Sequence, residues 1–333
     1  MAGNKRKVLI TGATGKQGGS AVRHMLGKGW NLTALTRDPK SKAAEALLEK
    51  GVEIVQGDME DASSLDGCLR GVYGVYSVQD FWSVGAKREV AQGKNLANAA
   101  KKTGVEHFVY SSVGGAERDT GIGHWESKWE IEKHIRKLGL PTTVLRPAAF
   151  MENYYVDQVE IGILQGKLYD PVRADKPYQT IASDDIGGFV ALAFERPKDF
   201  MGLELEIAGS ELTNLQAAEV LAKSWGGPSN SRRYRSHPPK SSSRCSTGST
   251  RRGSTPTSLS CTSNIPRCAS GRLSNGSTTR VGTSAPGTSP LLTTDFIAGG
   301  YTCRRYTTIL SSRFHGTAKR ASLGSTGKRR PPR

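Results

Sequence analysis

Short apolar runs alternate with amphipathic stretches along the first two thirds of the chain, and Gly, Pro or Asp separates them. This alternation predicts βαβ units with right-handed crossovers and a parallel sheet covered on both faces. Six strands by residue 145 match the doubly wound α/β sheet, the Rossmann fold. Strands are expected at Val8–Thr11, Leu32–Thr36, Val52–Gln56, Gly74–Val78, His107–Ser111 and Thr142–Leu145, and helices at Gly19–Lys28, Ala43–Lys50, Ala62–Leu69, Val84–Thr103 and Trp125–Leu138.

The following segment is less regular. It predicts a helix at Gly188–Phe194, a strand at Leu203–Ala208 and a helix at Asn214–Trp225 with its cap near Thr213. These elements suit a small, incomplete substrate-side lobe better than a second independent domain. We therefore divide the chain into a nucleotide-binding core (1–150), the elements of the lobe (151–226) and a tail (227–333).

Charge separates the tail from the rest of the chain. The net charge is +17, but residues 227–333 hold 16 Arg, 3 Lys and the single acid Asp295, and residues 1–226 carry −1. The tail also has 21 Ser, 16 Thr and no Trp. Such a composition buries too little apolar surface to offset the ordering entropy of its backbone, so a disordered tail is expected.

The cysteines and the lengths of the apolar runs indicate the cellular compartment of the protein. Cys68 is the single cysteine before the tail, and the four tail cysteines match no zinc-site spacing. No stretch approaches the length that spans a bilayer, and no secretory signal is evident. We expect a cytoplasmic protein without a metal site or a membrane partner.

A glycine-rich turn follows the first strand. Gly12 allows the tight turn, Gly15 lets the backbone approach a pyrophosphate, and Gly18 lets the helix pack closely. The N–H groups of the next helix then face the phosphates. No Gly-Lys-Ser/Thr ends the loop, which excludes a Walker phosphate loop. The alternative is a plain turn; the predicted contacts are Gly12, Thr14, Gly15, Lys16, Gln17 and Gly18.

The ends of the second and third strands indicate which dinucleotide binds. Arg37 suits an adenosine 2′-phosphate, which favours NADP(H) over NAD(H), unless it is a solvated loop arginine. Asp58 could accept a hydrogen bond from the adenine amino group, and Met59 could pack on the ring; a turn-capping role for Asp58 is the alternative.

With the glycine turn, Arg37, Asp58 and the later segment Leu145–Asn153, the chain resembles the NmrA-like family, an atypical branch of the short-chain dehydrogenases/reductases. The resemblance covers about residues 5–226 and implies NAD(P) binding, with redox-sensing regulators and reductases among the relatives. It also implies contacts along the nicotinamide half of the cofactor from Gln79, Asp80, Phe81, Met151, Glu152, Asn153 and Tyr154.

Ordinary short-chain dehydrogenases use Ser, Tyr and Lys, with Tyr and Lys one helical turn apart. Here Lys128 is present, His124 takes the tyrosine position, and Ser111 and Ser112 end the strand that would carry the serine. One hypothesis is an NADPH-dependent reductase of a small carbonyl, quinone or imine, in which Lys128 orients the ribose and His124 or water supplies the proton. The other is a catalytically weak sensor of the NADPH/NADP ratio with a protein partner.

Aromatic side chains after strands four to six could form a substrate pocket or belong to the core: Phe81, Trp82, Trp125, Phe150, Tyr154 and Tyr155.

For the tail, three hypotheses remain. The first is a basic arm that binds nucleic acid, although few aromatic residues are interleaved with the arginines. The second is a solvated tail, and the third is an out-of-frame product. With GC-rich codons chosen freely, back-translating residues 227–252 in a shifted frame can give Pro-Val-Lys-Phe-type sequence, so a frameshift near 226–229 is the preferred origin.

Overall fold

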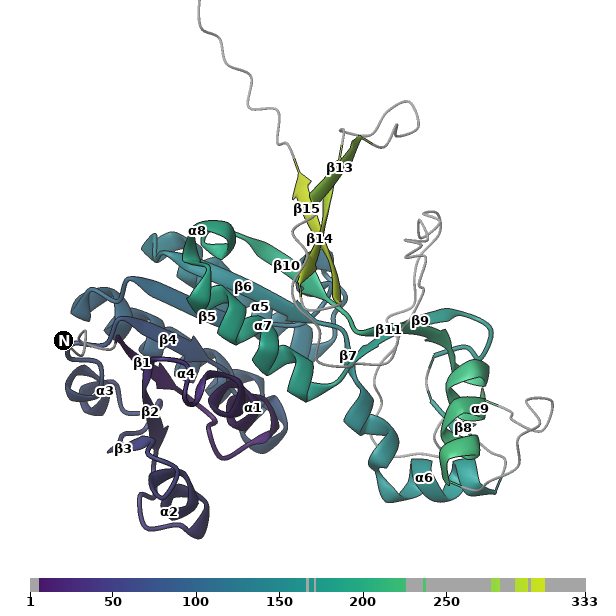
Figure 1. Cartoon of the computed structure of the whole chain (residues 1–333), viewed down its shortest axis with the longest axis horizontal. Coiled ribbons are helices and arrows are strands. Elements are labelled where there is room, and N and C mark those ends of the chain that lie inside the picture. The colour runs from purple at the N-terminus through teal and green to yellow at the C-terminus, as the bar shows by residue number, and fades with distance from the viewer. Residues whose placement is uncertain are drawn as a thin grey trace, which may run out of the picture.

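The computed structural model describes residues 6–165, 168–170, 172–225, 236–237, 277–281, 291–298 and 301–308. Seven parallel strands form the main sheet in the order β3-β2-β1-β4-β5-β6-β10 (Figure 1). The order reverses between β1 and β4, so the predicted Rossmann fold is confirmed. The strands are β1 Lys7–Ile10, β2 Asn31–Thr36, β3 Glu53–Gln56, β4 Gly74–Ser77, β5 His107–Ser111, β6 Thr142–Pro147 and β10 Glu204–Ile207.

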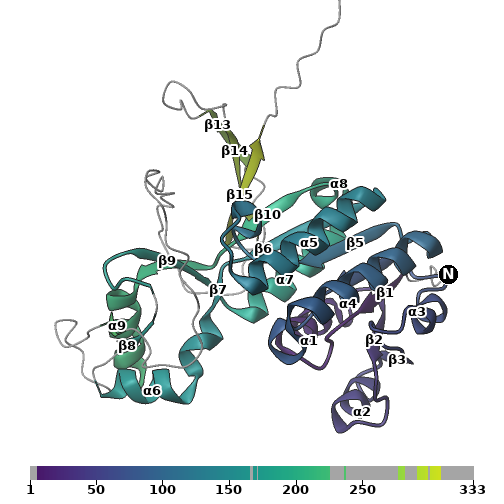
Figure 2. The same cartoon turned by 180° about the vertical axis from the view of Figure 1, so that it is seen from behind.

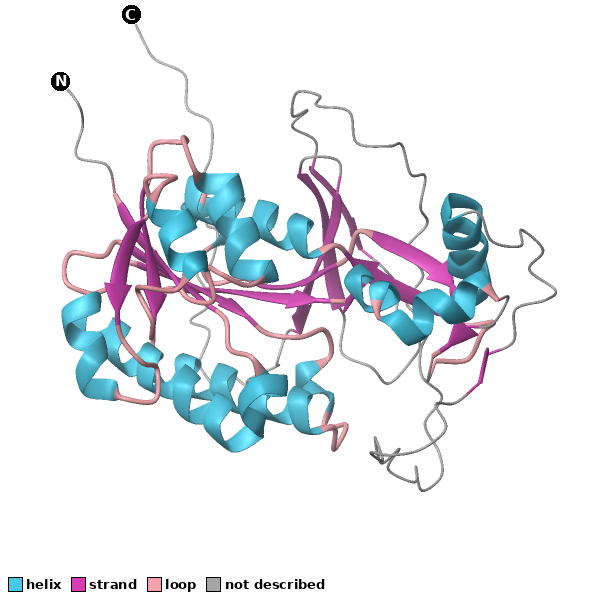
Figure 3. Cartoon of the chain, turned by 90° about the horizontal axis from the view of Figure 1, so that it is seen from below, coloured by secondary structure: helices cyan, strands magenta, loops and turns pink. Residues whose placement is uncertain are grey.

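Helices cover both faces of this sheet (Figure 3). One face packs against α1 and α7, and the other against α3, α4 and α5. Every residue of β4 and β5 is buried, which explains why these strands are short apolar runs rather than alternating ones. The helices are α1 Lys16–Met25, α2 Lys42–Leu48, α3 Ala62–Cys68, α4 Phe81–Thr103, α5 Gly123–Leu138 and α7 Ser183–Glu195, which the short α8 Pro197–Phe200 follows.

Several helices differ from the predicted ones in where they begin or in their course. Helix α7 begins five residues before the expected start because it packs on α1: a Cβ at Gly187 would lie 2.1 Å from Ser20 Oγ. Helix α1 begins at Lys16, directly after the glycine turn. Helix α4 includes a kink at Gly85, whose φ of 76° lies in the left-handed region that favours glycine.

A smaller lobe lies beside the carboxyl end of the sheet (Figure 2). It has a three-stranded sheet, two helices and a small apolar cluster around Tyr154 and Ile163. The sequence predicts its last helix but not its short strands, and β10, expected in the lobe, joins the main sheet beside β6. The lobe elements are β7 Ala149–Phe150, η2 Met151–Tyr155, α6 Asp157–Leu164, β8 Leu168–Tyr169, β9 Pro177–Ile181, β11 Ser210–Thr213, α9 Asn214–Trp225 and β12 Ser236–His237, which pairs with β8.

Three further strands come from the part of the chain for which a disordered tail is expected. Strands β13 Ser277–Val281, β14 Leu291–Ala298 and β15 Tyr301–Thr308 pair antiparallel, and β15 adds antiparallel to β10. The sequence does not predict them, although Thr, Tyr, Phe and Ile favour strands. The other residues of the predicted disordered segment, apart from β12, lie outside the described residues.

Candidate functional site

The glycine turn joins β1 to α1 at the point where the strand order reverses. Gly12 has a φ of 59°, and its carbonyl accepts a hydrogen bond from Gly15 N at 2.8 Å. A Cβ at Gly18 would lie 2.2 Å from Gly12 O, so no other residue fits there without a shift of the backbone. The predicted tight turn at Gly12 and the predicted close helix packing at Gly18 agree with this geometry.

Helix α1 begins without a capping side chain. Its N-cap is Gly15, and its first turn contains no acidic residue. The first N–H groups of a helix have no partner within the helix and carry the positive end of its dipole. Thr14 and Lys16 are exposed beside them. This helix end is therefore free to bind an anion such as a pyrophosphate.

Gln17 connects the turn to two neighbouring strands. Its Oε1 accepts hydrogen bonds from Ser111 Oγ at 2.7 Å and from Tyr76 OH at 3.2 Å. Burial raises the pKa of Tyr76, so the phenol remains a neutral donor. Gln17 is predicted as a cofactor contact, but its side-chain carbonyl is occupied within the protein and fixes the turn to β4 and β5.

The loop after β2 presents Arg37 to solvent. The guanidinium of Arg37 forms no ion pair with any described residue, and its carbonyl accepts a bond from Gln56 Nε2 at 3.3 Å. Asp38 fixes the loop: its Oδ1 accepts from Lys40 N at 3.0 Å and its carbonyl accepts from Ser41 Oγ at 2.9 Å. The loop thus holds a charged side chain ready for an anionic group beside the turn.

Among the described residues, three buried polar atoms without a hydrogen-bond partner follow strand ends, two after the neighbouring strands β4 and β5 of the main sheet and one after β7 of the lobe sheet. They are Gln79 Oε1 after β4, Ser112 Oγ after β5 and Glu152 Oε2 after β7. The other polar atom of each longer side chain is bonded: Gln79 Nε2 to Ser77 Oγ at 3.0 Å, and Glu152 Oε1 to Ser183 N at 2.9 Å. Because an unpaired buried polar group is costly, these atoms fit the polar groups of a bound ligand.

Asp58 and Asp80 serve local structure. Asp58 Oδ1 accepts from Glu60 N at 2.9 Å, and Asp80 Oδ1 accepts from Trp82 N at 3.1 Å as the N-cap of α4. Met59 contacts Gln79 through its sulfur, which accepts from Gln79 Nε2 at 3.7 Å. Met59 and Gln79 are therefore neighbours, whereas the two carboxylates make turn and cap contacts.

Aromatic rings gather where α4 and α5 begin. Phe81, Trp82 and His124 lie with ring centroids 5.2 to 5.5 Å apart, and Trp82 is 79% exposed. Trp125 lies 5.6 Å from His124. Of the six aromatics proposed for a pocket, Phe81, Trp82 and Trp125 come together around His124. Phe150 packs against the core, and Tyr155 packs on Trp225 in the lobe.

Asn153 and Tyr154, two of the predicted cofactor contacts, lie apart from the aromatic rings at the starts of α4 and α5. Tyr154 is buried in the lobe cluster, where its OH contacts Asn214 Oδ1 at 3.5 Å and burial raises its pKa to about 12. Asn153 is exposed, and Met151 lies in the same short helix, η2. Of the Met151–Tyr154 segment, Glu152 thus has the clearest unpaired polar atom.

Lys128 and His124 occupy neighbouring turns of α5. Lys128 Nζ lies 2.7 Å from Glu89 Oε1, and Ser127 Oγ donates to the other oxygen of Glu89. Burial, with a smaller effect of the Lys128 charge, lowers the pKa of His124. The imidazole is therefore neutral at neutral pH, where it is a weaker acid than imidazolium.

The predicted site omits Glu89 and Tyr76, which the structure places at its base. Glu89 has a recognisable signal: it is an acid on the stripe of α4 that Leu96, Ala97 and Ala100 make apolar. Tyr76 lies inside a buried strand and has no comparable signal.

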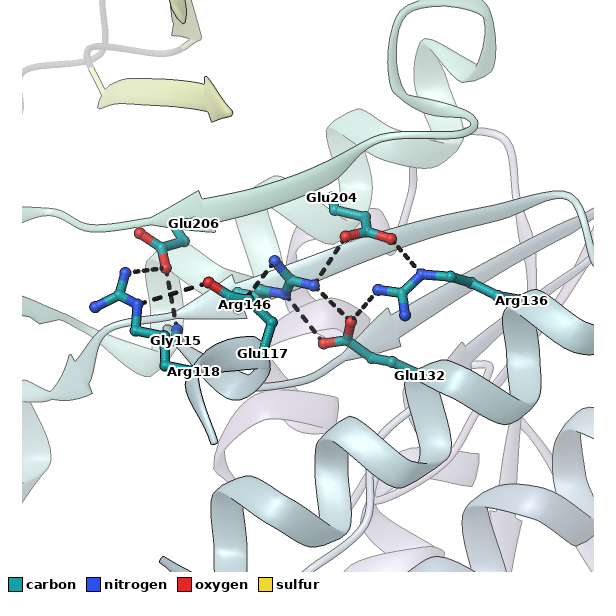
Figure 4. A network of polar contacts seen from close by, with 8 residues as sticks. All are labelled: Gly115, Glu117, Arg118, Glu132, Arg136, Arg146, Glu204 and Glu206. Carbon is teal, nitrogen blue, oxygen red and sulfur yellow. Dashed lines mark hydrogen bonds and ion pairs between the residues drawn. The ribbon is translucent and has the colours of Figure 1, made fainter. Parts of the chain in front are cut away.

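An ion network around the buried Arg146 and Glu132 fixes the segment between Ser112 and His124 (Figure 4). Arg146 on β6 contacts Glu132 at 2.6 Å, Glu204 at 2.8 Å and Glu117 at 3.2 Å. Glu117 lies in a 3-10 helix at Ala116–Arg118, and the preceding Gly115 N donates to Glu206 at 3.0 Å. Burial opposes the Arg146 charge, but these carboxylates raise its pKa overall. The network ties this segment to β6, β10 and α5.

No group of three metal-ligating side chains occurs among the described residues, and no helix in the described ranges is long and apolar enough to cross a membrane.

Known proteins are similar to this chain in sequence. An NmrA-like family domain-containing protein of Dictyostelium discoideum is 30% identical over 238 residues, 66% of this chain and 77% of that protein. An NAD(P)H azoreductase of Xenophilus azovorans is 31% identical over 246 residues, 65% of this chain and 83% of that protein. Matches to fungal NmrA-like oxidoreductases span about half of those proteins, 49% and 51%.

Among solved structures, the quinone oxidoreductase QOR2 of Escherichia coli in complex with NADPH is 26% identical with a TM-score of 0.60, and the match covers 69% of this chain and 78% of that one. The NmrA-like family itself matches residues 4–238. The chain belongs to the NmrA-like family, a family with NAD(P)-binding oxidoreductases among its members.

Proposed function

We propose that the chain binds NADP(H) across the carboxyl ends of β1, β2, β4 and β5. The observation that carries this proposal is the uncapped start of α1 behind a turn in which Gly18 has no room for a Cβ. This helix end would hold the pyrophosphate, and Arg37 would pair with the 2′-phosphate. Gln79, Ser112 and Glu152 offer unpaired polar atoms to the nicotinamide half, with Lys128 at the ribose.

The proposed activity is an NADPH-dependent reduction of a small carbonyl, quinone or imine. NADPH, when bound, supplies the hydride. The exposed ring of Trp82 and the half-buried ring of His124 lie 5.2 Å apart and form an aromatic wall at the edge of the site, which suits such substrates. Because the pKa of His124 is lowered, water is the favoured proton source at neutral pH, and His124 takes this role at lower pH.

A titration that compares NADPH with NADH tests the cofactor preference. Wild-type protein should bind NADPH about tenfold more tightly than NADH, a difference of about 1.4 kcal/mol, because the Arg37 guanidinium pairs with the 2′-phosphate. Arg37→Ala should lose most of this difference and keep its NADH affinity. Lys50→Ala, which removes an exposed cation after α2, is the matched control. Equal affinity of the wild type for both cofactors contradicts the role of Arg37.

The missing tyrosine and the neutral His124 favour a second candidate, a sensor of the NADP(H) ratio with a protein partner. Consumption of NADPH with a panel of quinones and aldehydes separates the two functions. Turnover supports the reductase, and tight NADPH binding without turnover supports the sensor. We place either function in a reducing, cytoplasmic compartment, in keeping with the free thiol of Cys68.

A further inference from the structure

Glu89 is a charged residue in a place where charge is costly. Its side chain is fully buried on the face of α4 that packs against α5. A buried carboxylate needs an ionic partner and further hydrogen bonds. Glu89 has both, because Lys128 Nζ lies 2.7 Å from Oε1 and the Ser127 hydroxyl donates to Oε2. Both oxygens of the carboxylate are thus held by adjacent residues of α5.

One helical turn after Glu89 and Ser127, α4 and α5 are held at a fixed separation. A Cβ at Gly93 would lie 2.6 Å from Ile131 Cδ1, so α4 and α5 are in close contact at this level. Glu89 precedes Gly93 by four residues, and Ser127 precedes Ile131 by four, so the two pairs lie on the same faces of the helices. This close contact fixes the position of Glu89 along the helix axes and its distance from Lys128.

Lys128 is positioned by this contact on a half-buried helix face. Its side chain is 13% exposed, against 33% for Lys94, which pairs with Glu130 between the same two helices. A lysine side chain has four rotatable bonds and loses its freedom only where contacts hold it. With Glu89 on one side, the ammonium retains further N–H donors for an acceptor toward the carboxyl end of the sheet.

We propose that Glu89 is a positioning residue, whose buried carboxylate holds the Lys128 ammonium in place for the nicotinamide ribose in a helix that lacks the tyrosine one turn before the lysine. This inference rests on the proposed binding of NADP(H). Glu89 does not touch the cofactor and acts through Lys128. The tether comes from α4 rather than from the helix that carries the lysine.

Glu89→Gln tests the inference, because it keeps the shape and removes the charge. NADPH affinity at pH 7 should fall about tenfold, and it should fall further between pH 7 and 9 as the half-buried ammonium, without its carboxylate, loses its proton. The wild type should show a flat profile in this range. His124 and Tyr110, the other titratable groups beside this pair, remain neutral there, since the pKa of His124 is lowered and that of Tyr110 is raised, both chiefly by burial.

Glu89→Asp keeps the charge and should restore the flat profile, and it is the variant to measure if Glu89→Gln does not fold. Glu130→Gln, in the exposed pair between the same helices, should leave affinity unchanged. In a double-mutant cycle with Lys128→Gln, adding Glu89→Gln should change affinity no further. Additive losses, or a flat profile in Glu89→Gln, overturn the inference. Absence of NADPH and NADH binding by the wild type instead refutes the proposed function.

Discussion

At the scale of single residues, His107 is the buried group whose protonation is most clearly opposed. The Thr143 hydroxyl donates to Phe200 O at 2.8 Å, so its oxygen accepts from His107 Nε2, also at 2.8 Å. This assigns the Nε2–H tautomer and leaves Nδ1 buried without a partner. Burial lowers the pKa of His107 from 6.5 to about 4.

Stability should therefore decrease in acid. Between pH 6.5 and about 4 the unfolded chain binds a proton at His107 that the folded chain does not, so the free energy of unfolding falls as the pH falls through this window. From pH 7 to pH 5 this amounts to about 2 kcal/mol, at about 1.4 kcal/mol per pH unit. Urea unfolding at both pH values measures the change.

The control for this prediction is a histidine at a more exposed site. His107→Gln should remove the largest single part of this pH dependence, and His134→Gln, whose ring contacts Asn98 at 2.8 Å near solvent, should remove little of it. An unchanged pH dependence in His107→Gln would contradict the assignment of the effect to this residue.

The candidate site shows which residue contacts a sequence can predict. The glycine turn was predictable because its requirements are local: a positive φ at Gly12 and close approach at Gly18 arise within seven residues. The contacts of Gln17 and Lys128 were not, because their partners lie 94 and 39 residues away in the chain. The orientation of these side chains depends on packing that no short motif encodes.

At the scale of elements, Arg146 joins a strand, a helix and the segment that carries the candidate serine. Arg146→Met should lower the free energy of unfolding by an amount near the low end of about 3–5 kcal/mol, because buried Glu132 loses one of its two arginines and keeps Arg136 at 2.8 Å. Chemical denaturation measures it. Arg118→Met, in the half-exposed pair with Glu206, should cost less than about 1 kcal/mol. Equal losses would contradict a special role of the buried pair.

The core strands were predictable at this scale because a buried parallel strand is a continuous apolar run between Gly, Pro or Asp. Each of the six predicted core strands is present, with ends shifted by at most two residues. The strands of the lobe were not predictable: β7 has two residues, and β9 and β11 are mostly half-buried polar sequences. Such strands depend on their partners, since polar residues at a partly exposed surface leave little pattern.

At the scale of the whole molecule, the lobe exposes apolar side chains. Tyr155, Val156, Ile161, Leu164 and Val220 are each 41% to 60% exposed, on η2, α6 and α9 and the joint between the first two. The NmrA-like match ends at residue 238, close to the change in composition at residue 227. A surface of this kind normally packs against further structure.

The genetic code relates the composition of the tail to an apolar sequence in a shifted frame. A serine codon TCN, read one base early, becomes NTC, which encodes Phe, Leu, Ile or Val whatever base precedes it. A threonine codon ACN becomes NAC, which encodes Tyr, His, Asn or Asp. Where the 21 Ser and 16 Thr of residues 227–333 are encoded by TCN and ACN, the shifted frame therefore gives a mixture of apolar and polar residues, typical of a folded lobe, whereas the serine codons AGT and AGC give NAG. We infer that residues after about 226–229 are read out of frame.

Sequencing the coding DNA around codons 226–229 tests this inference. The frame read one base early should be open through the tail and should continue the NmrA-like match past residue 238.

Protein expressed from the restored frame should bury the apolar residues of α6 and α9 and melt at a higher temperature, because each fully buried Leu or Ile contributes about 1.5–3 kcal/mol. As a control, a restored-frame protein with Ile161→Asp should lose part of the gain, whereas the same substitution should change little in the present chain, where Ile161 is 53% exposed. Stop codons early in the alternative frame, or a restored protein no more stable than this one, would reject the frameshift and leave the basic tail as a genuine part of the protein.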